Sequence, residues 1–145
     1  FVIAGKQEAV EGPVTLAKES GAKRAIMLQV SAPFHCTLLK PAEERLGPEL
    51  DACAFGDPQI PVVTNVDAAP AMTAAAARDA LKRQVSRPVR WQESVQWMLG
   101  EGVNTFVELG PGKILSGLVR AADKSAITFN VEDEKSLENA FNGLL

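Results

Sequence analysis

The sequence lacks several features that mark nucleic-acid-binding, membrane and secreted proteins. Its formal net charge is only −3, and no run of five like charges occurs, which argues against nucleic acid as a partner. Charge or glycine interrupts every apolar stretch before the roughly 18 to 20 residues that a membrane span needs. No signal-peptide pattern is present. We therefore expect a cytoplasmic chain with one globular core and no membrane contact.

Cysteine and histidine are also scarce. The two cysteines, Cys36 and Cys53, have no CxxC spacing and are too few for a disulfide scaffold or a zinc site. This usage favours a reducing compartment and predicts no metal centre. The chain has a single histidine, His35, which limits where histidine chemistry can occur.

What the sequence does contain is an alternation of strand-like and helix-like segments. Strand-like composition occurs in residues 1–5, 24–30, 60–65, 105–109 and 127–131. Helical periodicity occurs in residues 7–20, 38–50, 74–85, 91–99, 114–122 and 134–144. Alternating strands and helices predict an α/β fold with a largely parallel sheet. The strand–helix–strand order of the first thirty residues suggests one βαβ-like or ferredoxin-like half-unit.

Local signals refine these elements. Pro13 falls inside the first helix and predicts a kink or restart there. Pro41 suits the first turn of the second helix, and Thr73 is a candidate N-cap for the third. The chain opens directly on the strand-like residues from Phe1, which suggests a fragment whose neighbouring strands lie in chain that precedes it.

His35 lies between a strand-like and a helix-like segment, which is where α/β proteins place reactive side chains. A histidine that acts as a base for acyl transfer needs a nucleophile, but the chain has no GxSxG elbow. Cys36 is adjacent to His35, and adjacent residues cannot easily bring sulfur and imidazole together. If His35 is a base, we expect its nucleophile outside these residues.

Two other features are weaker candidates. The turn Gly110-Pro111-Gly112-Lys113 could bind an anion at a helix N-terminus, but it lacks the Walker A and dinucleotide fingerprints, so a tight strand-to-helix turn is favoured. Asp67 and Glu108 each follow a strand and could orient a histidine, although nothing in the sequence places either beside His35.

Five motifs in this order resemble malonyl-CoA:acyl carrier protein transacylases of the bacterial type. They are VIAG (residues 2–5), APFHCTLLKPA around His35, PVVTNVDA (61–68), RQVSRPVRW (83–91) and VELGPGKILSGL (107–118). The resemblance covers essentially the whole chain but only the carboxyl-terminal half of the family's sequence. It implies an α/β-hydrolase-like large subdomain with a ferredoxin-like small subdomain. Residues 1–30 would end the small subdomain, and residues 31–145 would form the carboxyl-terminal part of the large one.

The resemblance also implies a chemistry. In the family, a serine activated by histidine takes the malonyl group of malonyl-CoA, and the phosphopantetheine thiol of acyl carrier protein then accepts it. His35 matches the histidine, and Gln84 matches the position whose backbone carbonyl orients it. Phe34 matches a bulky residue that narrows the space beside the acyl α-carbon in enzymes that prefer malonyl groups. The reaction implies no cofactor beyond these two substrates.

Three family features are missing from these residues: the GHSxGE nucleophile motif, the arginine that pairs with the malonyl carboxylate, and the amino-terminal glutamine loop. We therefore expect the chain to be inactive alone and to need the amino-terminal half of the same enzyme. Two alternatives stay open. One is a piece of an acyltransferase domain from a polyketide or fatty-acid megasynthase, and the other is a non-catalytic α/β interaction module.

Overall fold

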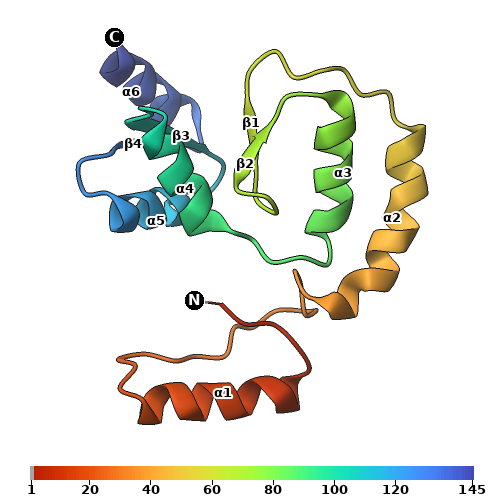
Figure 1. Cartoon of the computed structure of the whole chain (residues 1–145). Coiled ribbons are helices and arrows are strands. Elements are labelled where there is room, and N and C mark those ends of the chain that lie inside the picture. Colours follow the sequence, from red (N-terminus) through yellow and green to blue (C-terminus); the bar gives the residue numbers. More distant parts are fainter. Residues whose placement is uncertain (1) are drawn as a thin grey trace. The chain divides into compact units, whose positions relative to one another are not determined.

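The computed structural model describes residues 2–145 and separates the chain into two compact units (Figure 1). The amino-terminal unit ends at Arg90, and the carboxyl-terminal unit begins at Trp91. His35 and Gln84 both belong to the amino-terminal unit.

Within residues 2–90, the amino-terminal unit is built from three α-helices, one 3₁₀ helix and a β-hairpin. Its elements are α1 (Gln7–Glu19), η1 (Thr37–Leu39), α2 (Lys40–Ala52), β1 (Val62–Thr64), β2 (Ala69–Ala71) and α3 (Ala74–Gln84). Helix α3 lies between the hairpin and α2 (Figure 1). The predicted cap of α3 is confirmed, because the Thr73 hydroxyl accepts a hydrogen bond from the Ala76 amide. Pro41 lies in the first turn of α2, as predicted.

The strand predicted at residues 24–30 does not form. These residues have no regular secondary structure, and a strand exists only where a neighbouring strand completes its hydrogen bonds. Four of their apolar side chains are instead exposed: Ile26, Met27, Leu28 and Val30. The strand predicted at 1–5 is also wrong for residues 2–5, which are irregular, while Phe1 lies outside the described residues. Helix α1 continues through Pro13 without the predicted restart.

The hairpin is a second, antiparallel sheet that the sequence did not predict. Strands β1 and β2 are antiparallel, with Val62 opposite Ala71. No strand was predicted for β2, because its centre is Pro70, and proline cannot donate to a ladder and is tolerated only at edges. The turn between the two strands contains Ala68, whose φ of 52° lies in the left-handed region.

The carboxyl-terminal unit confirms the α/β prediction. Its elements are α4 (Trp91–Gly100), β3 (Thr105–Leu109), α5 (Ile114–Ala122), β4 (Ile127–Val131) and α6 (Glu134–Leu144). Strands β3 and β4 are parallel, with Thr105 opposite Ile127, and α5 is the crossover between them. The apolar face of α4 packs into a core formed by Val95, Val119 and Ala126. The amphipathic stripe predicted for residues 91–99 is therefore a packing surface.

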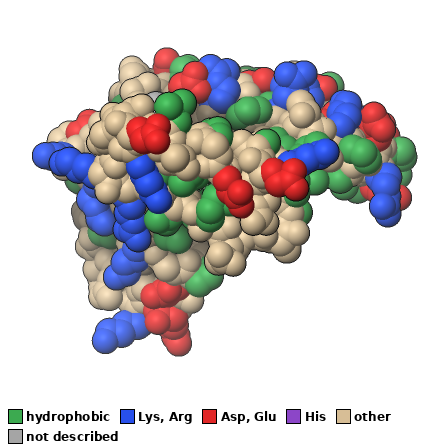
Figure 2. Space-filling model, turned by 90° about the horizontal axis from the view of Figure 1, so that it is seen from below, with side chains coloured by type: hydrophobic (Ala, Val, Ile, Leu, Met, Phe, Trp, Pro, Cys, Tyr) green, Lys and Arg blue, Asp and Glu red, His purple; other side chains and the backbone are tan. Residues whose placement is uncertain are grey.

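Apolar and charged side chains are interspersed on the surface shown in Figure 2. Many large apolar side chains are exposed, including Leu109 and Ile114 of the carboxyl-terminal unit. Within residues 2–145, no helix combines the length and the apolar character needed to cross a membrane.

Candidate active site

His35 lies in an irregular segment just before η1 and α2, and its backbone is unusual. Its φ is 58°, in the left-handed region that residues other than glycine seldom adopt. Such a conformation costs free energy and persists where the surrounding structure enforces it, most often at functional sites. The imidazole ring is exposed. The backbone therefore supports His35 as a functional residue.

The ring contacts the end of α3. His35 Nδ1 lies 2.9 Å from the backbone carbonyl oxygen of Gln84, the last residue of that helix. The last carbonyls of a helix have no partner within it, so this oxygen is free to accept. A carbonyl can only accept, which requires the proton on Nδ1. The neutral ring then keeps a lone pair on Nε2.

The contact predicted between His35 and the Gln84 carbonyl is therefore present. The Gln84 side-chain nitrogen also lies 3.4 Å from Nδ1, but it is a donor and cannot bond to a protonated Nδ1. It donates instead to the Arg87 carbonyl at 3.2 Å. Among residues 2–145, no hydrogen bond engages Nε2 of His35. The role of His35 as a base stays a prediction.

The helix end also provides an electrostatic environment. The carboxyl terminus of a helix carries a partial negative charge, which stabilises a cation placed within its last turn. His35 meets α3 at this end, through the last carbonyl. The ring is therefore held at the end of α3 that carries the partial negative charge.

Phe34 and Cys36 flank the histidine. Phe34 is 49% exposed, and its role in acyl specificity stays a prediction. The half-buried Cys36 thiol donates to the Pro33 carbonyl at 3.1 Å.

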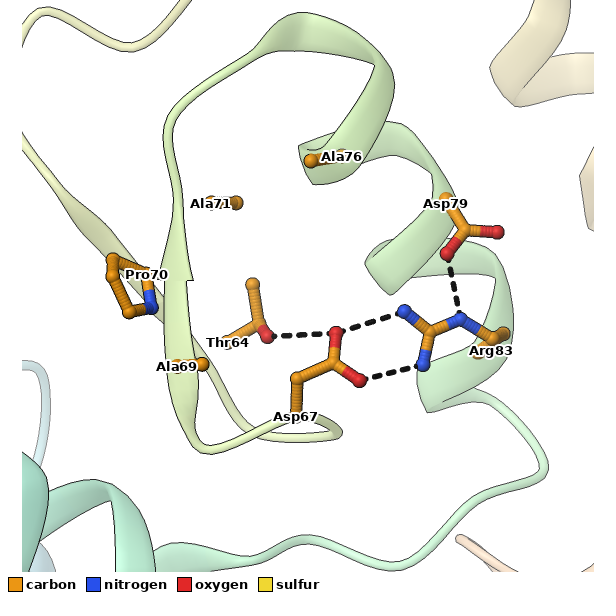
Figure 3. A pocket seen from close by; sticks show the side chains of 8 residues that line it. All are labelled: Thr64, Asp67, Ala69, Pro70, Ala71, Ala76, Asp79 and Arg83. Atoms are coloured by element: carbon orange, nitrogen blue, oxygen red, sulfur yellow. Dashed lines mark hydrogen bonds and ion pairs between the residues drawn. The ribbon is translucent and has the colours of Figure 1, made fainter.

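Asp67 does not orient the histidine. Its carboxylate forms a bidentate pair with the Arg83 guanidinium, with both oxygen–nitrogen distances at 2.8 Å, and it accepts from Thr64 (Figure 3). Arg83 lowers the pKa of Asp67 below its ordinary range by hydrogen bonding. Arg83 also donates to Asp79 at 2.7 Å. The network joins the hairpin turn to α3, so Asp67 has a structural role.

The same residues line a pocket of about 250 Å³ between the hairpin and α3 (Figure 3). A guanidinium in a pocket can bind an anionic group only through donors that are not already engaged. Here all three guanidinium nitrogens of Arg83 bind the carboxylates of Asp67 and Asp79. Three of the five N–H donors of Arg83 therefore bind carboxylates of the chain itself, and this network accounts for the charged groups that line the pocket.

Glu108 is likewise a structural residue. Its carboxylate accepts from the amides of Leu115 and Ser116 at 3.0 and 2.8 Å and from Asn130 at 2.8 Å. The hydrogen bond from the Ser116 amide is the largest cause that lowers the pKa of Glu108. A carboxylate of the chain thus caps the N-terminus of α5 and takes up amides that an anion site would need.

The glycine-rich turn before α5 is the tight turn that the sequence favoured. Gly110 and Gly112 have φ values of 133° and 88°, which residues with a Cβ rarely adopt. The Gly112 amide donates to the Glu132 carboxylate at 2.9 Å. The turn's geometry and partners therefore explain its glycines without a ligand.

The sequence did not reveal Glu43 and Ser86. Glu43 is buried in α2, and its carboxylate accepts hydrogen bonds from Lys40 and from the buried Ser86 hydroxyl. Lys40 and Glu43 are three residues apart and could be paired from helical spacing. No local signal connects Glu43 with Ser86, because that contact depends on how α2 packs against α3.

Comparison with known proteins gives consistent matches to one group. No family-level sequence profile matches the chain. It is 46% identical over 144 residues to the malonyl CoA-acyl carrier protein transacylase of Bacillus subtilis, which covers 99% of this chain and 45% of that protein. It is 50% identical over 119 residues to the corresponding Salmonella typhimurium protein, covering 82% of this chain and 38% of that protein.

Solved structures give the same result. An acyl-carrier-protein S-malonyltransferase from Burkholderia pseudomallei superposes with a TM-score of 0.89 at 45% identity, over 94% of this chain and 44% of that one. A malonyl-transacylase solved in complex with a type II polyketide acyl-carrier protein gives a TM-score of 0.91 at 43% identity, over 96% and 45% of the two chains. The chain spans less than half the length of these relatives. In sequence and in fold, it corresponds to the carboxyl-terminal part of malonyl CoA-acyl carrier protein transacylases.

Proposed function

We propose that this chain carries the histidine part of an active site that transfers a malonyl group from malonyl-CoA to the phosphopantetheine thiol of acyl carrier protein. The observation that carries the proposal is the 2.9 Å contact between His35 Nδ1 and the Gln84 carbonyl. It leaves Nε2 as the atom that can accept a proton. The sequence and structural relatives are named for this transfer.

The first half-reaction forms an acyl-enzyme. The hydroxyl of a serine supplied by the amino-terminal part of the enzyme attacks the thioester carbonyl of malonyl-CoA, and Nε2 of His35 takes the hydroxyl proton. The carbon–sulfur bond then breaks, and the imidazolium returns the proton to the departing CoA thiolate. The Gln84 carbonyl keeps the proton on Nδ1 throughout and holds the ring in one orientation.

The second half-reaction reverses these steps with a different thiol. The phosphopantetheine thiol gives its proton to Nε2 and attacks the malonyl-serine ester. The carbon–oxygen bond breaks, and the serine oxygen recovers the proton from the imidazolium. One group thus serves as base and acid in both halves, and the reaction needs no resident cofactor.

The proposal extends to acyl selectivity, to the partners of the chain and to its cellular location. The exposed Phe34 ring narrows the space at the acyl α-carbon, which favours malonyl over branched acyl groups. The residues of the chain contain no GHSxGE motif, so activity requires the amino-terminal half of the enzyme. The partners are this half, malonyl-CoA and acyl carrier protein, and the enzyme works in the cytoplasm.

A complementation assay tests the proposal. The amino-terminal part of the Bacillus subtilis relative, which has no counterpart in this chain, is fused to the chain's amino terminus. We call the resulting protein the complemented transacylase. We expect malonyl-CoA to add a malonyl group to this protein in intact-mass spectra, and the group to pass to phosphopantetheinylated acyl carrier protein. The 145-residue chain alone is the control and should transfer nothing. A folded complemented protein that forms no malonyl-enzyme would refute the proposed function.

A further inference from the structure

Two hydrogen bonds join the same two segments of the amino-terminal unit. One runs from His35 at the entrance to α2 to the Gln84 carbonyl at the end of α3. The other runs from the Ser86 hydroxyl, in the turn just after α3, to the carboxylate of Glu43 in α2. The Ser86–Glu43 bond therefore joins the same two regions, the start of α2 and the end of α3, that the His35–Gln84 bond joins.

The two bonds differ in their exposure to water. The His35 ring is exposed, whereas Glu43 is 9% and Ser86 only 3% exposed. An exposed hydrogen bond competes with water and contributes little to holding two segments together. His35 also has an unfavourable left-handed backbone that its surroundings must enforce. The buried bond resists opening because separation would leave polar groups unpaired in the interior.

Glu43 holds α2 and the turn after α3 together through directional hydrogen bonds as well as through packing. One carboxylate oxygen accepts from Lys40 and the other from Ser86. These hydrogen bonds, with that from Lys40 the larger, lower the pKa of Glu43 and keep it ionised near neutral pH. Hydrogen bonds to an ionised acceptor are stronger and more directional than neutral ones. A buried ionic group can thus select one arrangement where an apolar residue would only fill space.

Hydrogen bonds within the turn that carries Ser86 hold its residues together. The amides of Ser86 and Arg87 both donate to the Arg83 carbonyl, at 3.3 and 3.0 Å. The Gln84 side chain donates to the Arg87 carbonyl at 3.2 Å. Residues 83–87 are therefore linked to one another, and a movement of Ser86 away from α2 carries the Gln84 carbonyl with it.

We propose that Glu43 and Ser86 are positioning residues for His35: their buried hydrogen bond holds the end of α3 against α2 and thereby keeps the Gln84 carbonyl within bonding distance of Nδ1. Neither residue touches the reacting groups. Their effect is on the tautomer and orientation of the imidazole. The consequence for catalysis rests on the proposed function, whereas the consequence for the tautomer does not.

The tautomer can be read directly, because His35 is the only histidine in the chain. Nitrogen-15 NMR of the 145-residue chain labelled at histidine distinguishes a proton on Nδ1 from one on Nε2. In the unaltered chain at a pH where the ring is neutral, we expect the proton on Nδ1. Ser86→Ala removes the hydroxyl donor and should shift the population measurably toward Nε2–H.

Ser116→Ala is the matched control. Ser116 is also a buried serine, 2% exposed, with its hydroxyl hydrogen-bonded to Asn130 in the carboxyl-terminal unit. Its loss should leave the His35 tautomer unchanged. If Ser86→Ala does not fold, Ser86→Cys keeps similar volume with a weaker donor and should give a smaller shift. A folded Ser86 variant with an unaltered tautomer overturns the proposal.

A kinetic measurement separates positioning from substrate binding. In the complemented transacylase, Ser86→Ala should lower kcat by roughly 10- to 100-fold and leave KM for malonyl-CoA nearly unchanged, since small misplacements of a catalytic group have effects of this size. An equal loss in Ser116→Ala would overturn the positioning role. If the complemented protein transfers no malonyl group while the tautomer still shifts, only the proposed function fails.

Discussion

The turn at His35 and the turn at Gly110–Gly112 each precede a helix, yet they use their polar groups in opposite ways. In the second turn, Glu108 caps α5 and Glu132 accepts from the Gly112 amide. At His35, Nδ1 is engaged, and Nε2 has no hydrogen bond within residues 2–145. A turn whose groups are satisfied by its own chain is structural. An unengaged nitrogen on a strained backbone is instead suited to bind or react.

The two units show a similar difference in packing. Val95 of the carboxyl-terminal unit is completely buried, in a core shared with Val119 and Ala126. In the amino-terminal unit, by contrast, apolar residues between positions 26 and 30 are exposed, and β1 begins with the 45% exposed Val62. The carboxyl-terminal unit thus contains a fully buried apolar side chain, and we expect truncation of Val95 to cost more stability than truncation of the exposed Val62.

The largest effect should come from the unengaged histidine. His35→Ala in the complemented transacylase should lower kcat/KM for malonyl transfer by about 10⁴-fold or more, as expected when a base is removed from a serine–histidine pair. His35→Asn should do the same while tolerating the left-handed backbone better. The exposed Lys124→Ala is the control. If kcat/KM falls less than tenfold in folded His35 variants, the claim that the His35 turn is functional and the glycine turn structural is contradicted.

The contrast in packing predicts the next largest effect. Val95→Ala removes two methyl groups from a fully buried position and should lower the free energy of unfolding by about 2 to 3 kcal/mol. Val62→Ala should cost less than about 1 kcal/mol. Circular dichroism during urea unfolding follows both units, and the fluorescence of Trp91 and Trp97, which both lie in α4, reports separately on the carboxyl-terminal unit. Equal costs for the two variants would contradict the contrast.

Two glycines of the carboxyl-terminal unit should respond to alanine substitution with opposite changes in the free energy of unfolding. Gly112→Ala should destabilise by about 1 kcal/mol, because its φ of 88° disfavours a side chain. Gly117 lies inside α5, and a Cβ added there meets nothing within 4 Å. Gly117→Ala should therefore stabilise by up to about 1 kcal/mol. The same fluorescence measurement applies, and destabilisation by both variants would contradict the account.

The smallest expected effect is a pH dependence in the amino-terminal unit. The pKa of Glu43 is lower in the folded chain than its ordinary value of 4.5, so its contribution is complete above that value. It is lost as pH falls through the folded pKa. Circular dichroism should show that Glu43→Gln makes stability less dependent on pH below about 4.5. The exposed Glu44→Gln is the control, and a matching change there would contradict the assignment.

The sequence was informative where local chemistry decides the structure. The alternation of β3, α5, β4 and α6 follows from periodicity, and Thr73 and the glycine turn follow from capping and backbone preferences. Resemblance to a family also pointed to the contact between His35 and Gln84, which residue patterns alone could not place. Prediction failed at residues 24–30 because composition shows that a segment can form a strand, but not whether a partner strand is present.

Long-range contacts account for what the sequence left open. Asp67 and Glu108 follow strands, so they were reasonable partners for a histidine, but their partners are Arg83 and the N-terminus of α5. The buried pair of Glu43 and Ser86 joins residues that are distant in sequence and carry no recognisable spacing. Such contacts depend on how the helices pack against each other, and local sequence patterns do not reveal that packing.

The central claim is that the Gln84 carbonyl holds the proton on Nδ1 of His35 and leaves Nε2 as the base. Nitrogen-15 NMR of the histidine-labelled chain tests it most directly, since only one imidazole contributes. The account predicts that the neutral ring has a protonated Nδ1 and an unprotonated Nε2. A neutral ring with its proton mainly on Nε2 would contradict it.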